Sequence, residues 1–415
     1  MSKSPKGKIP KRLCSATAKQ SRFFPDFDAT FAGGGTMDVK SLLDVCQSEL
    51  RPMLQCLRQT VEIESPSSSK PGVDRLARFI AEECRQCVGK THLLKHPVAG
   101  SAVLAEFWPG KRNQKPILLL GHLDTVWEIG TLAQMPFRVC GERAFGPGIF
   151  DMKSGIVIGL WAIRALKALK ISPPGPIHFF LNSDEEVSSV AFRKELLAEA
   201  GRARAVLVLE PAAAGGALKT ARKGVGEFKI TVHGRSAHAG VNAVAGVNAI
   251  SELIRQMRRI EAMARPRQGL TVNVGRIEGG TRSNVVPERA TAWIDVRIPW
   301  LRDRAVIERQ VRGLKPCHPE ARLEIEGGIN RPPMERKVAA ALFRKARVLG
   351  RAMGMDLTEA STGGGSDGNF TAALGVPTLD GLGAVGDGAH ARHEHILISE
   401  LPRRAALLAA LLATL

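Results

Sequence analysis

A histidine and a carboxylate stand two residues apart in Gly121-His122-Leu123-Asp124-Thr125, directly after the apolar run 117–120. An imidazole at the end of a buried strand, with a carboxylate beside it to orient the ring, is common around a bound metal ion. A histidine that closes a hydrogen-bonded turn produces the same short pattern. This pair alone leaves both interpretations open, and the rest of the chain must supply partners to decide between them.

Four acidic residues supply such partners: Asp151, Glu185, Glu186 and Glu210. The last three follow apolar runs that predict buried strands, and Asp151 stands in a Gly-Pro-Gly loop before a helix. Open α/β sheets bind ligands at the carboxyl ends of their strands, so these groups are expected to converge there. Their negative charges would repel one another unless cations were present. Acids at a helix N-terminus would explain Glu185 and Glu186 alone, but not His122.

The elements that must position these residues alternate between apolar strands and helices, which predicts a parallel sheet covered on both faces. The expected strands are 102–107, 116–120, 177–181, 205–209 and 377–379. The expected helices are 38–61, 74–88, 156–170, 192–199, 337–353 and 400–415. The sequence therefore predicts an α/β fold for this part of the chain.

A middle segment has a different pattern, with the order βαββαβ of a ferredoxin-like sandwich. Its expected strands are 226–232, 270–277, 290–297 and 321–325, and its expected helices are 243–263 and 304–313. We therefore expect residues 37–216 and 330–415 to form one domain, with residues 217–329 inserted as a second, α+β domain. Residues 1–36 mix Lys, Ser, Pro and Gly without periodicity, and we expect them to be disordered.

Composition narrows the class of protein. The chain has 415 residues, 44% of them hydrophobic, so two domains with sizeable cores are expected. No apolar run approaches the roughly 18 residues of a membrane span, and no membrane partner is expected. The net charge of +19 raises the question of nucleic-acid binding. Because the basic residues are spread over several expected helices and no nucleic-acid module is present, a solvated basic surface is the better explanation.

The seven cysteines are odd in number and scattered, which is typical of reduced thiols rather than a disulfide framework. Cys84 and Cys87 form the one close pair, in an expected helix and without a second pair in zinc-finger spacing, so we interpret them as core or helix surface. No signal-peptide-length apolar stretch follows the N-terminal lysines. These observations predict a cytoplasmic protein.

Seven motifs together resemble a known family. They are Gly121-His122-Leu123-Asp124-Thr125, Gly146-Pro147-Gly148 with Asp151-Met152-Lys153, Asp184-Glu185-Glu186, Glu210-Pro211, Gly234-Arg235-Ser236-Ala237-His238-Ala239-Gly240, Gly363-Gly364-Gly365-Ser366-Asp367 and Gly388-Ala389-His390. Their order is similar to that of the di-zinc exopeptidase and deacylase family, which includes glutamate carboxypeptidase of the G type, acetylornithine deacetylase and succinyl-diaminopimelate desuccinylase. The resemblance runs from about residue 38 to the C-terminus and is greatest for glutamate carboxypeptidase.

The resemblance implies a mixed, mainly parallel catalytic sheet and a site for two Zn²⁺ ions, with Co²⁺ or Mn²⁺ as substitutes. The implied metal ligands are His122, Asp151, Glu186, Glu210 and His390, with Asp151 bridging the two ions. Glu185 would be the general base, and Asp124 would orient His122. His390 is preferred to His393 and His395, which are interpreted as surface residues, because it matches the family's Gly-Ala-His-x-x-x-Glu pattern, with Glu394 as the acid.

The inserted domain would be a lid and dimerisation domain by the same resemblance. His238 would reach the active site of the partner subunit in a homodimer and stabilise the oxyanion; without its motif it would be read as a turn histidine. The implied substrate-binding residues are Asn284, Arg297, Arg331, Gly364 and Gly365. Arg297 is equally consistent with an exposed strand residue, and Arg222-Lys223-Gly224 has no specific counterpart in the resemblance.

The sequence thus predicts a zinc-dependent hydrolase that cleaves a C-terminal amide and releases an amino acid, such as glutamate, from a peptide or N-acyl conjugate. An N-acyl-amino-acid deacylase is the alternative within the same chemistry. A relative that binds ligand without turnover and a nucleic-acid binder are the alternatives from other classes. Retention of Glu185 argues against the binding protein, because binding alone does not require a base.

Overall fold

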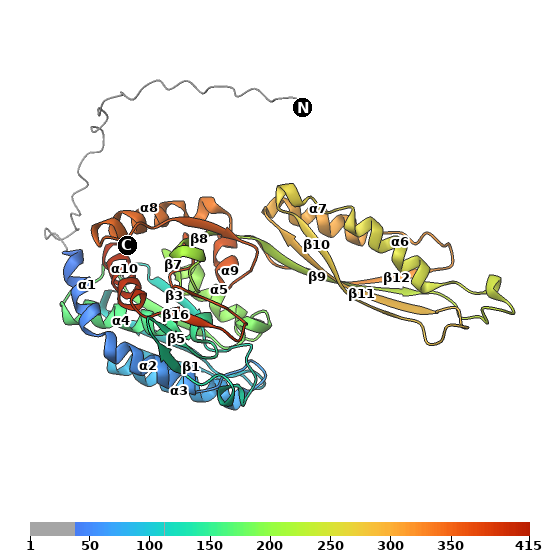
Figure 1. Ribbon diagram of the computed structural model, residues 1–415. Helices are drawn as coiled ribbons and strands as arrows, with labels where there is room; N and C mark the ends of the chain where they lie inside the picture. Colours follow the sequence, from blue (N-terminus) through green and yellow to red (C-terminus); the bar gives the residue numbers. More distant parts are fainter. Residues whose placement is uncertain (1–37, 112) are drawn as a thin grey trace, which may run out of the picture. The chain divides into compact units, whose positions relative to one another are not determined.

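A six-stranded mixed sheet lies at the centre of the larger group of elements in the computed structural model, which describes residues 38–111 and 113–415 (Figure 1). The disorder expected for residues 1–36 falls outside this range. The strands are β1 (Lys90–Leu94), β2 (Ala102–Phe107), β3 (Ile117–His122), β6 (Ile177–Asn182), β7 (Ala205–Val208) and β14 (Thr378–Leu379), in the order β1-β2-β6-β3-β7-β14. The pairs β6–β3, β3–β7 and β7–β14 are parallel, whereas β1–β2 and β2–β6 are antiparallel. The expected mixed α/β sheet is confirmed.

Alternate residues of the central strands pack against different helices, as a sheet covered on both faces requires. Leu118 and Leu120 of β3 lie in a buried cluster with Leu196 of α5 and with Phe370 of α9. On the other face, Gly159 of α4 lies so close to the Phe179 ring that an added Cβ would be 2.7 Å from it. The helices are α1 (Val39–Ser48), α2 (Leu50–Glu62), α3 (Lys70–Gln86), α4 (Ser154–Ala168), α5 (Arg193–Arg202), α8 (Arg336–Ala352), α9 (Gly368–Ala373) and α10 (Glu400–Thr414).

One expected helix differs from the structure. The segment 38–61 was expected to be continuous, but α1 and α2 are separated at Glu49, whose φ of −93° and ψ of 8° are not helical. Pro52 explains the break, because proline lacks an N–H group and its ring collides with the carbonyl group four residues earlier. The interpretation of Cys84 and Cys87 holds, since both are buried.

The inserted segment forms its own four-stranded antiparallel sheet (Figure 1). Its elements are β9 (Gly224–His233), α6 (Ala249–Glu261), β10 (Thr271–Gly279), β11 (Arg289–Ile298), α7 (Leu301–Arg312) and β12 (Arg322–Arg331), and its strand order is β10-β11-β9-β12. Ile230, Leu253 and Ile294 belong to a buried cluster that joins the sheet to α6. The βαββαβ order is as expected, but α6 begins six residues later than the expected helix 243–263.

Two smaller sheets were not expected from the sequence. β8 (Leu218–Arg222) pairs in parallel with β13 (Glu359–Thr362), directly before the chain enters β9. The strands β4 (Arg138–Cys140), β5 (Arg143–Phe145), β15 (Gly386–Asp387) and β16 (His395–Leu397) form the other sheet, in the order β15-β16-β5-β4. The strands of this second sheet have three residues or fewer, so they carry little alternation by which to recognise them.

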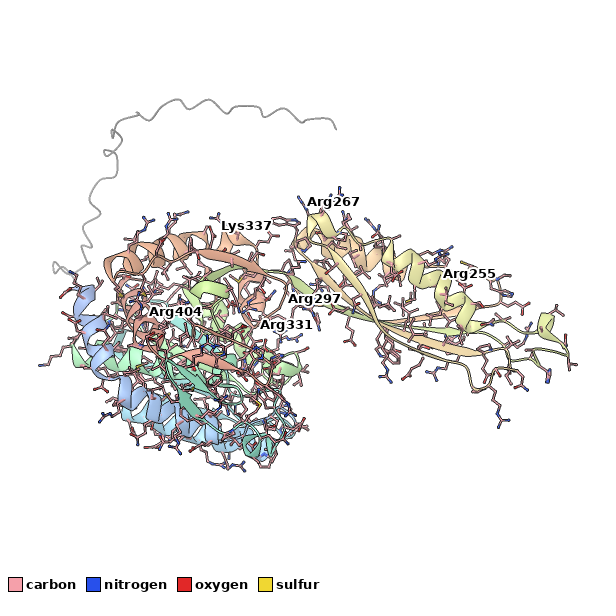
Figure 2. The ribbon with its side chains drawn as sticks, viewed as in Figure 1. Arg255, Arg267, Arg297, Arg331, Lys337 and Arg404 are labelled. Carbon is pink, nitrogen blue, oxygen red and sulfur yellow. The ribbon has the colours of Figure 1, made fainter. Side chains whose placement is uncertain are left out.

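The surface carries its basic residues on separate elements. Figure 2 labels Arg255 on α6 and Lys337 on α8, whose side chains are 56% and 79% exposed. This distribution agrees with a solvated basic surface. Among the helices of residues 38–111 and 113–415, none has both the length and the apolar character that crossing a bilayer requires.

Candidate metal centre

His122 is the last residue of β3 and is only 2% exposed. Its Nε2 atom lies 3.3 Å from Asp151 Oδ1 and 3.5 Å from Glu210 Oε1. Its Nδ1 atom lies 2.9 Å from the main-chain oxygen of Asp124, an acceptor, so Nδ1 carries a proton. Nε2 therefore faces the two carboxylates and is the ring nitrogen available to a metal ion.

The side chain of Asp124 has several partners besides His122. Its two carboxylate oxygens accept hydrogen bonds of 3.1 Å from the backbone N–H groups of Glu185 and Glu186, and one of them accepts a 2.6 Å bond from Ser67. The carboxylate is 3.4 Å from His122 Nδ1, longer than the bond to the main-chain oxygen. Asp124 thus joins the ends of β3 and β6 and orients His122 mainly through its backbone.

His390 is the one of the three C-terminal histidines that lies beside the acidic residues. Its Nε2 atom is 3.4 Å from Asp151 Oδ2 and 3.5 Å from Glu186 Oε1. His393 is exposed, as expected, but the interpretation of His395 as a surface residue is wrong. His395 is buried in β16 because its ring packs against Phe145 of β5, with the ring centroids 5.3 Å apart.

The spacing of these atoms fits divalent metal ions. Two atoms that each lie about 2.0–2.1 Å from one tetrahedral zinc ion are roughly 3.3–3.5 Å apart, which matches the four distances from His122 and His390 to their neighbouring carboxylates. Asp151 offers one oxygen to the His122 side and the other to the His390 side. Glu186 Oε1 is buried without a hydrogen-bond partner among the described residues. Imidazole nitrogens and carboxylate oxygens are suitable zinc ligands.

The electrostatics of the cluster also favour bound cations. Burial lowers the pKa of His122, but the neighbouring Asp124, Asp151 and Glu210 outweigh this and hold the pKa well above its usual value. The nearby carboxylates of Asp151 and Glu186, at 3.4 and 3.5 Å from Nε2, raise the pKa of His390 to about 10. Because each imidazole gains positive charge so readily, the surrounding carboxylates create a field that would also stabilise a metal ion.

Glu394 holds the loop that carries Asp151. Its carboxylate accepts hydrogen bonds from the backbone N–H groups of Gly148 at 2.9 Å, Phe150 at 2.9 Å and Asp151 at 3.0 Å, and from Trp127 Nε1 at 2.7 Å. In the sequence, Glu394 is noted only as the acid four residues after His390, and its four hydrogen-bond donors cannot be recognised there. Glu394 therefore fixes the backbone on which Asp151 stands.

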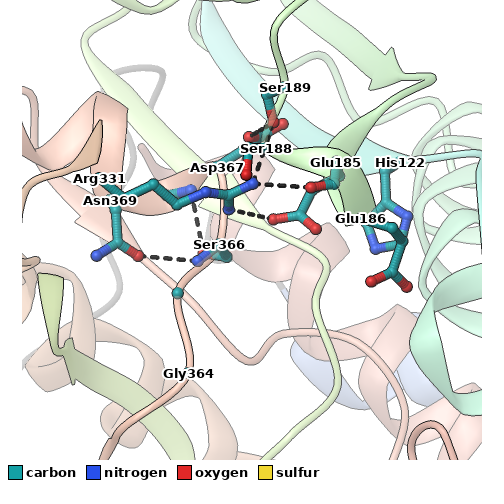
Figure 3. A network of polar contacts seen from close by, with 12 residues as sticks. His122, Glu185, Glu186, Ser188, Ser189, Arg331, Gly364, Ser366, Asp367 and Asn369 are labelled. Atoms are coloured by element: carbon teal, nitrogen blue, oxygen red, sulfur yellow. Dashed lines mark hydrogen bonds and ion pairs between the residues drawn. The ribbon is translucent and has the colours of Figure 1, made fainter. Parts of the chain in front are cut away.

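Glu185 is not free in this structure. Arg331, the last residue of β12, donates from Nη1 to a carboxylate oxygen of Glu185, and from Nη2 to its main-chain oxygen at 2.8 Å (Figure 3). The same Nη2 lies 3.3 Å from Ser189 Oγ, and Ser189 donates to Asp367. Burial raises the pKa of Glu185 to about 8 although Arg331 opposes the shift. A carboxyl group with such a pKa is suited to accepting and returning protons near neutral pH.

The atoms of His122, Glu185 and Glu210 also lie within 4.8 Å of one another, as do those of His122, Asp151 and Glu186. The first of these groups would by distance alone admit Glu185 as a metal ligand. Arg331 engages one oxygen of Glu185, and Arg222 engages one oxygen of Glu210, so each of these two acids keeps its other oxygen for a further partner.

Of the remaining residues suggested by the resemblance, some lie close to the Gly363–Gly365 loop and Arg331, and others are exposed. Arg297 Nη1 lies 3.4 Å from the main-chain oxygen of Gly363, and Gly365 lies beside the Arg331 side chain. His238 and Asn284 are exposed, and the adjoining loop is closed by a 3.0 Å bond from Ala239 N to Asn284 O. Within the described part of the chain, no hydrogen bond or ion pair joins His238 to the metal-centre residues.

Comparison with known proteins places this geometry in a family. Residues 118–414 match the model of peptidase family M20/M25/M40. The chain is 31% identical over 392 residues to carboxypeptidase G2 of Pseudomonas sp. strain RS-16, covering 90% of this chain and 92% of that protein.

Solved structures share the fold. The M20 family metallo-carboxypeptidase Sso-CP2 of Sulfolobus solfataricus has a TM-score of 0.69 at 17% identity, over 87% of this chain and 98% of its own. The Bacillus subtilis YXEP protein, described as a dinuclear metal-binding peptidase of family M20, has a TM-score of 0.65 at 16% identity, over 88% and 98% of the two chains.

The chain therefore belongs to peptidase family M20/M25/M40, and the family expected from the seven motifs is confirmed. It is a carboxypeptidase-like enzyme that hydrolyses peptide bonds, with a buried His/Asp/Glu group able to bind metal. Its substrates are small peptides as a class, in agreement with the expected small-molecule partner. Membership of this peptidase family favours an enzyme over the alternative of a binding protein without catalysis.

Proposed function

We propose that this enzyme is a di-zinc carboxypeptidase that releases a C-terminal amino acid with a side-chain carboxylate, such as glutamate. The observation that carries this proposal is the pair of ligand clusters around Asp151, beside a glutamate held by an arginine. The similarity to carboxypeptidase G2 supports the carboxypeptidase direction of cleavage.

The proposed ligand set divides between two positions that share Asp151. His122 and Glu210 would complete the first position, and Glu186 and His390 the second. Ions bound there would supply positive charge and Lewis acidity to the scissile carbonyl group. Co²⁺ or Mn²⁺ would be accepted in place of Zn²⁺, because the same nitrogen and oxygen ligands suit them.

Glu185 is the proposed general base and acid. Its carboxylate would take a proton from the attacking water and deliver it to the amine as the C–N bond breaks, so the proton ends on the leaving group. The backbone of Glu185 is well fixed, because its N–H donates to Asp124 and its carbonyl accepts from Arg331. Only the carboxylate is left to change partner during the reaction.

Arg331 is the proposed binding residue for a substrate carboxylate. Its guanidinium can hold a carboxylate with two parallel hydrogen bonds, and its buried position would make that interaction strong. A substrate carboxylate would then compete with Glu185 for Arg331. Binding of a substrate with this group would release the base that acts on it, which favours acidic C-terminal residues. Arg297, Asn284, Gly364 and Gly365 would provide the remaining substrate contacts.

Residues 217–329 would serve as a lid and as the contact between subunits of a homodimer, with residues 37–216 and 330–415 as the catalytic domain. The exposure of His238 supports this proposal, because an exposed imidazole is free to enter the site of a partner subunit and stabilise the oxyanion. The reduced thiols of the described cysteines support a cytoplasmic location.

The test is a metal analysis followed by hydrolysis of a panel of dipeptides and N-acyl amino acids. We expect two tightly bound divalent ions per chain and the fastest release for a C-terminal glutamate. In Glu185→Gln, activity should fall by about 10²–10⁴-fold while the metal content is retained. Glu195→Gln, which changes an exposed glutamate of α5, is the matched control and should behave as the wild type.

Two results would contradict the proposal. Substoichiometric metal in a fully loaded preparation would remove its basis. A preference for N-acyl groups that is indifferent to the released amino acid would instead identify a deacylase, and Arg331→Gln would then leave the KM of the best substrate unchanged.

A further inference from the structure

Arg222, the last residue of β8, is buried beneath the candidate metal centre and is 4% exposed. Its guanidinium makes five contacts: Nε to Asp380 Oδ2 at 2.7 Å, Nη2 to Asp380 Oδ1 at 2.8 Å and to Glu210 Oε2 at 3.2 Å, and Nη1 to the main-chain oxygens of Gly364 at 3.2 Å and Gly365 at 3.1 Å. A guanidinium has five N–H donors, so this set engages every one of them.

The backbone around Arg222 is also fixed. Its N–H and carbonyl groups both bond to Met334 at 3.0 Å, where the chain returns from β12, and β8 pairs with β13. Asp380 is completely buried, holds the guanidinium with two bonds and accepts a 2.7 Å bond from Ser366. Because one side of the guanidinium is locked by Asp380, the direction of its remaining donors is determined.

These remaining donors reach two parts of the site at once. Arg222 engages Oε2 of Glu210, while Oε1 of the same carboxylate is the atom 3.5 Å from His122 Nε2. The hydrogen bond from Arg222 thus holds Oε2 of Glu210, and Oε1 is left facing His122. The two carbonyl bonds hold Gly364 and Gly365, which stand in the loop proposed to contact substrate.

We propose that Arg222 is a positioning residue that orients Glu210 toward the metal ion and fixes the Gly363–Gly365 loop at the same time. This inference rests on the proposed role of Glu210 as a metal ligand. Arg222 acts through these groups and contacts neither substrate nor metal itself. A lysine at this position would keep the positive charge but could not make the five directed bonds, so geometry rather than charge is the property to test.

The experiment compares the full-length apo form of Arg222→Lys with the wild type. ZnCl₂ is titrated by calorimetry, the absorption spectrum of added Co²⁺ reports ligand geometry, and kcat and KM are measured on the best dipeptide. We expect one of the two Zn²⁺ affinities to fall by about 10–100-fold, the Co²⁺ spectrum to change, and KM to rise because the loop is no longer held.

Arg404→Lys is the matched control. Arg404 lies in α10, is also buried at 1% exposure, and donates to the main-chain oxygen of Gly216 rather than to the site (Figure 2). It should leave both Zn²⁺ affinities, the Co²⁺ spectrum and KM unchanged. If Arg222→Lys does not fold, the double variant Arg222→Met/Asp380→Asn removes the buried cation together with its main anion, and the same loss of one Zn²⁺ affinity is expected.

The outcomes separate this inference from the proposed function. A wild type that binds fewer than two Zn²⁺ ions at saturation contradicts the di-zinc function. A wild type that binds two, with Arg222 variants that match it in both affinities and in KM, overturns the positioning role alone. Equal losses in the Arg222 and Arg404 variants would also overturn it, because the effect would then come from disturbing any buried arginine.

Discussion

Glu252 in helix α6 of the inserted segment and Glu186 beside the six-stranded sheet are both carboxylates withdrawn from solvent, yet their surroundings differ. Glu252 accepts hydrogen bonds from the backbone of Cys317 at 2.7 Å and His318 at 3.1 Å, and from Gln256 at 2.6 Å. Although burial opposes it, this shell holds the pKa of Glu252 below its usual value. Burial instead raises the pKa of Glu186, and one of its oxygens has no donor among the described residues.

This difference indicates what each carboxylate is for. In α6, the donors that satisfy Glu252 come from its own region, so the group contributes to folding without help from a ligand. At the rim of the larger sheet, Glu186 is left short of a donor, which costs folding free energy in the apo chain. A bound cation would remove that cost. A buried carboxylate without enough donors is therefore a sign of a ligand site.

The largest expected effect comes from Glu186→Gln. We expect peptidase activity to fall by more than about 100-fold and one metal ion to be lost, because the variant lacks a charged ligand. The apo chain should be no less stable than the wild type, since the substitution removes a carboxylate whose charge is disfavoured by burial and one of whose oxygens has no hydrogen-bond donor among the described residues. Activity assays, metal analysis and thermal unfolding of apo protein would check this, and unchanged metal content would contradict it.

The second largest expected effect is a loss of thermal stability when the metal is removed from the wild-type protein. A ligand present at a thousand times its Kd stabilises the native state by about 4 kcal/mol, so chelation should lower the Tm markedly. Thermal unfolding with and without a chelator measures this change. The shift should be smaller in Glu186→Gln, and an equal shift in both proteins would show that the chelator acts elsewhere.

Glu252→Gln should have the opposite profile. Loss of a charged acceptor with three donors is expected to lower the free energy of unfolding by about 1–3 kcal/mol, while metal content and activity per folded molecule stay unchanged. Denaturant unfolding provides the measurement. Glu261→Gln, at an exposed position of the same helix, is the control and should change stability little. Destabilisation by both variants alike would mean that the donors around Glu252 are unimportant.

The smallest effect is the pH dependence of that difference. Because the pKa of Glu252 is lowered from its usual value of 4.5, its stabilisation is complete above that value and is lost as the pH falls through the folded-state pKa. The gap in unfolding free energy between wild type and Glu252→Gln should therefore shrink when the pH is lowered from about 7 to about 3. A gap that is constant over this range would assign the effect to packing instead of charge.

Much of the catalytic sheet could be predicted because its signals are local. The apolar runs that became β3, β6 and β7 are short strands with nearly every residue buried, and polar residues lie at or shortly after the end of each one. Local pattern was less informative where one proline ends a helix or where a distant strand determines whether a residue is buried. Pro52 divides the first helix, and His395 is buried because β16 pairs with β5, whose residues lie about 250 positions earlier in the chain.

The partners of the site residues were the least accessible to prediction. Arg222 was noticed in the sequence without a role, since its contacts with Asp380 join positions 158 residues apart. The pairing of Arg331 with Glu185 spans 146 residues, and that of Glu394 with Asp151 spans 243. No local pattern records which cation will meet which carboxylate.

The sequence alone therefore determined the family, the fold class and the residue types available for catalysis, because hydrophobic periodicity and short motifs are properties of neighbouring residues. Tertiary structure decided which histidine of three lies beside Glu186, which carboxylate is engaged by an arginine, and which carboxylates remain short of donors. Those outcomes depend on the closure of long loops and on burial.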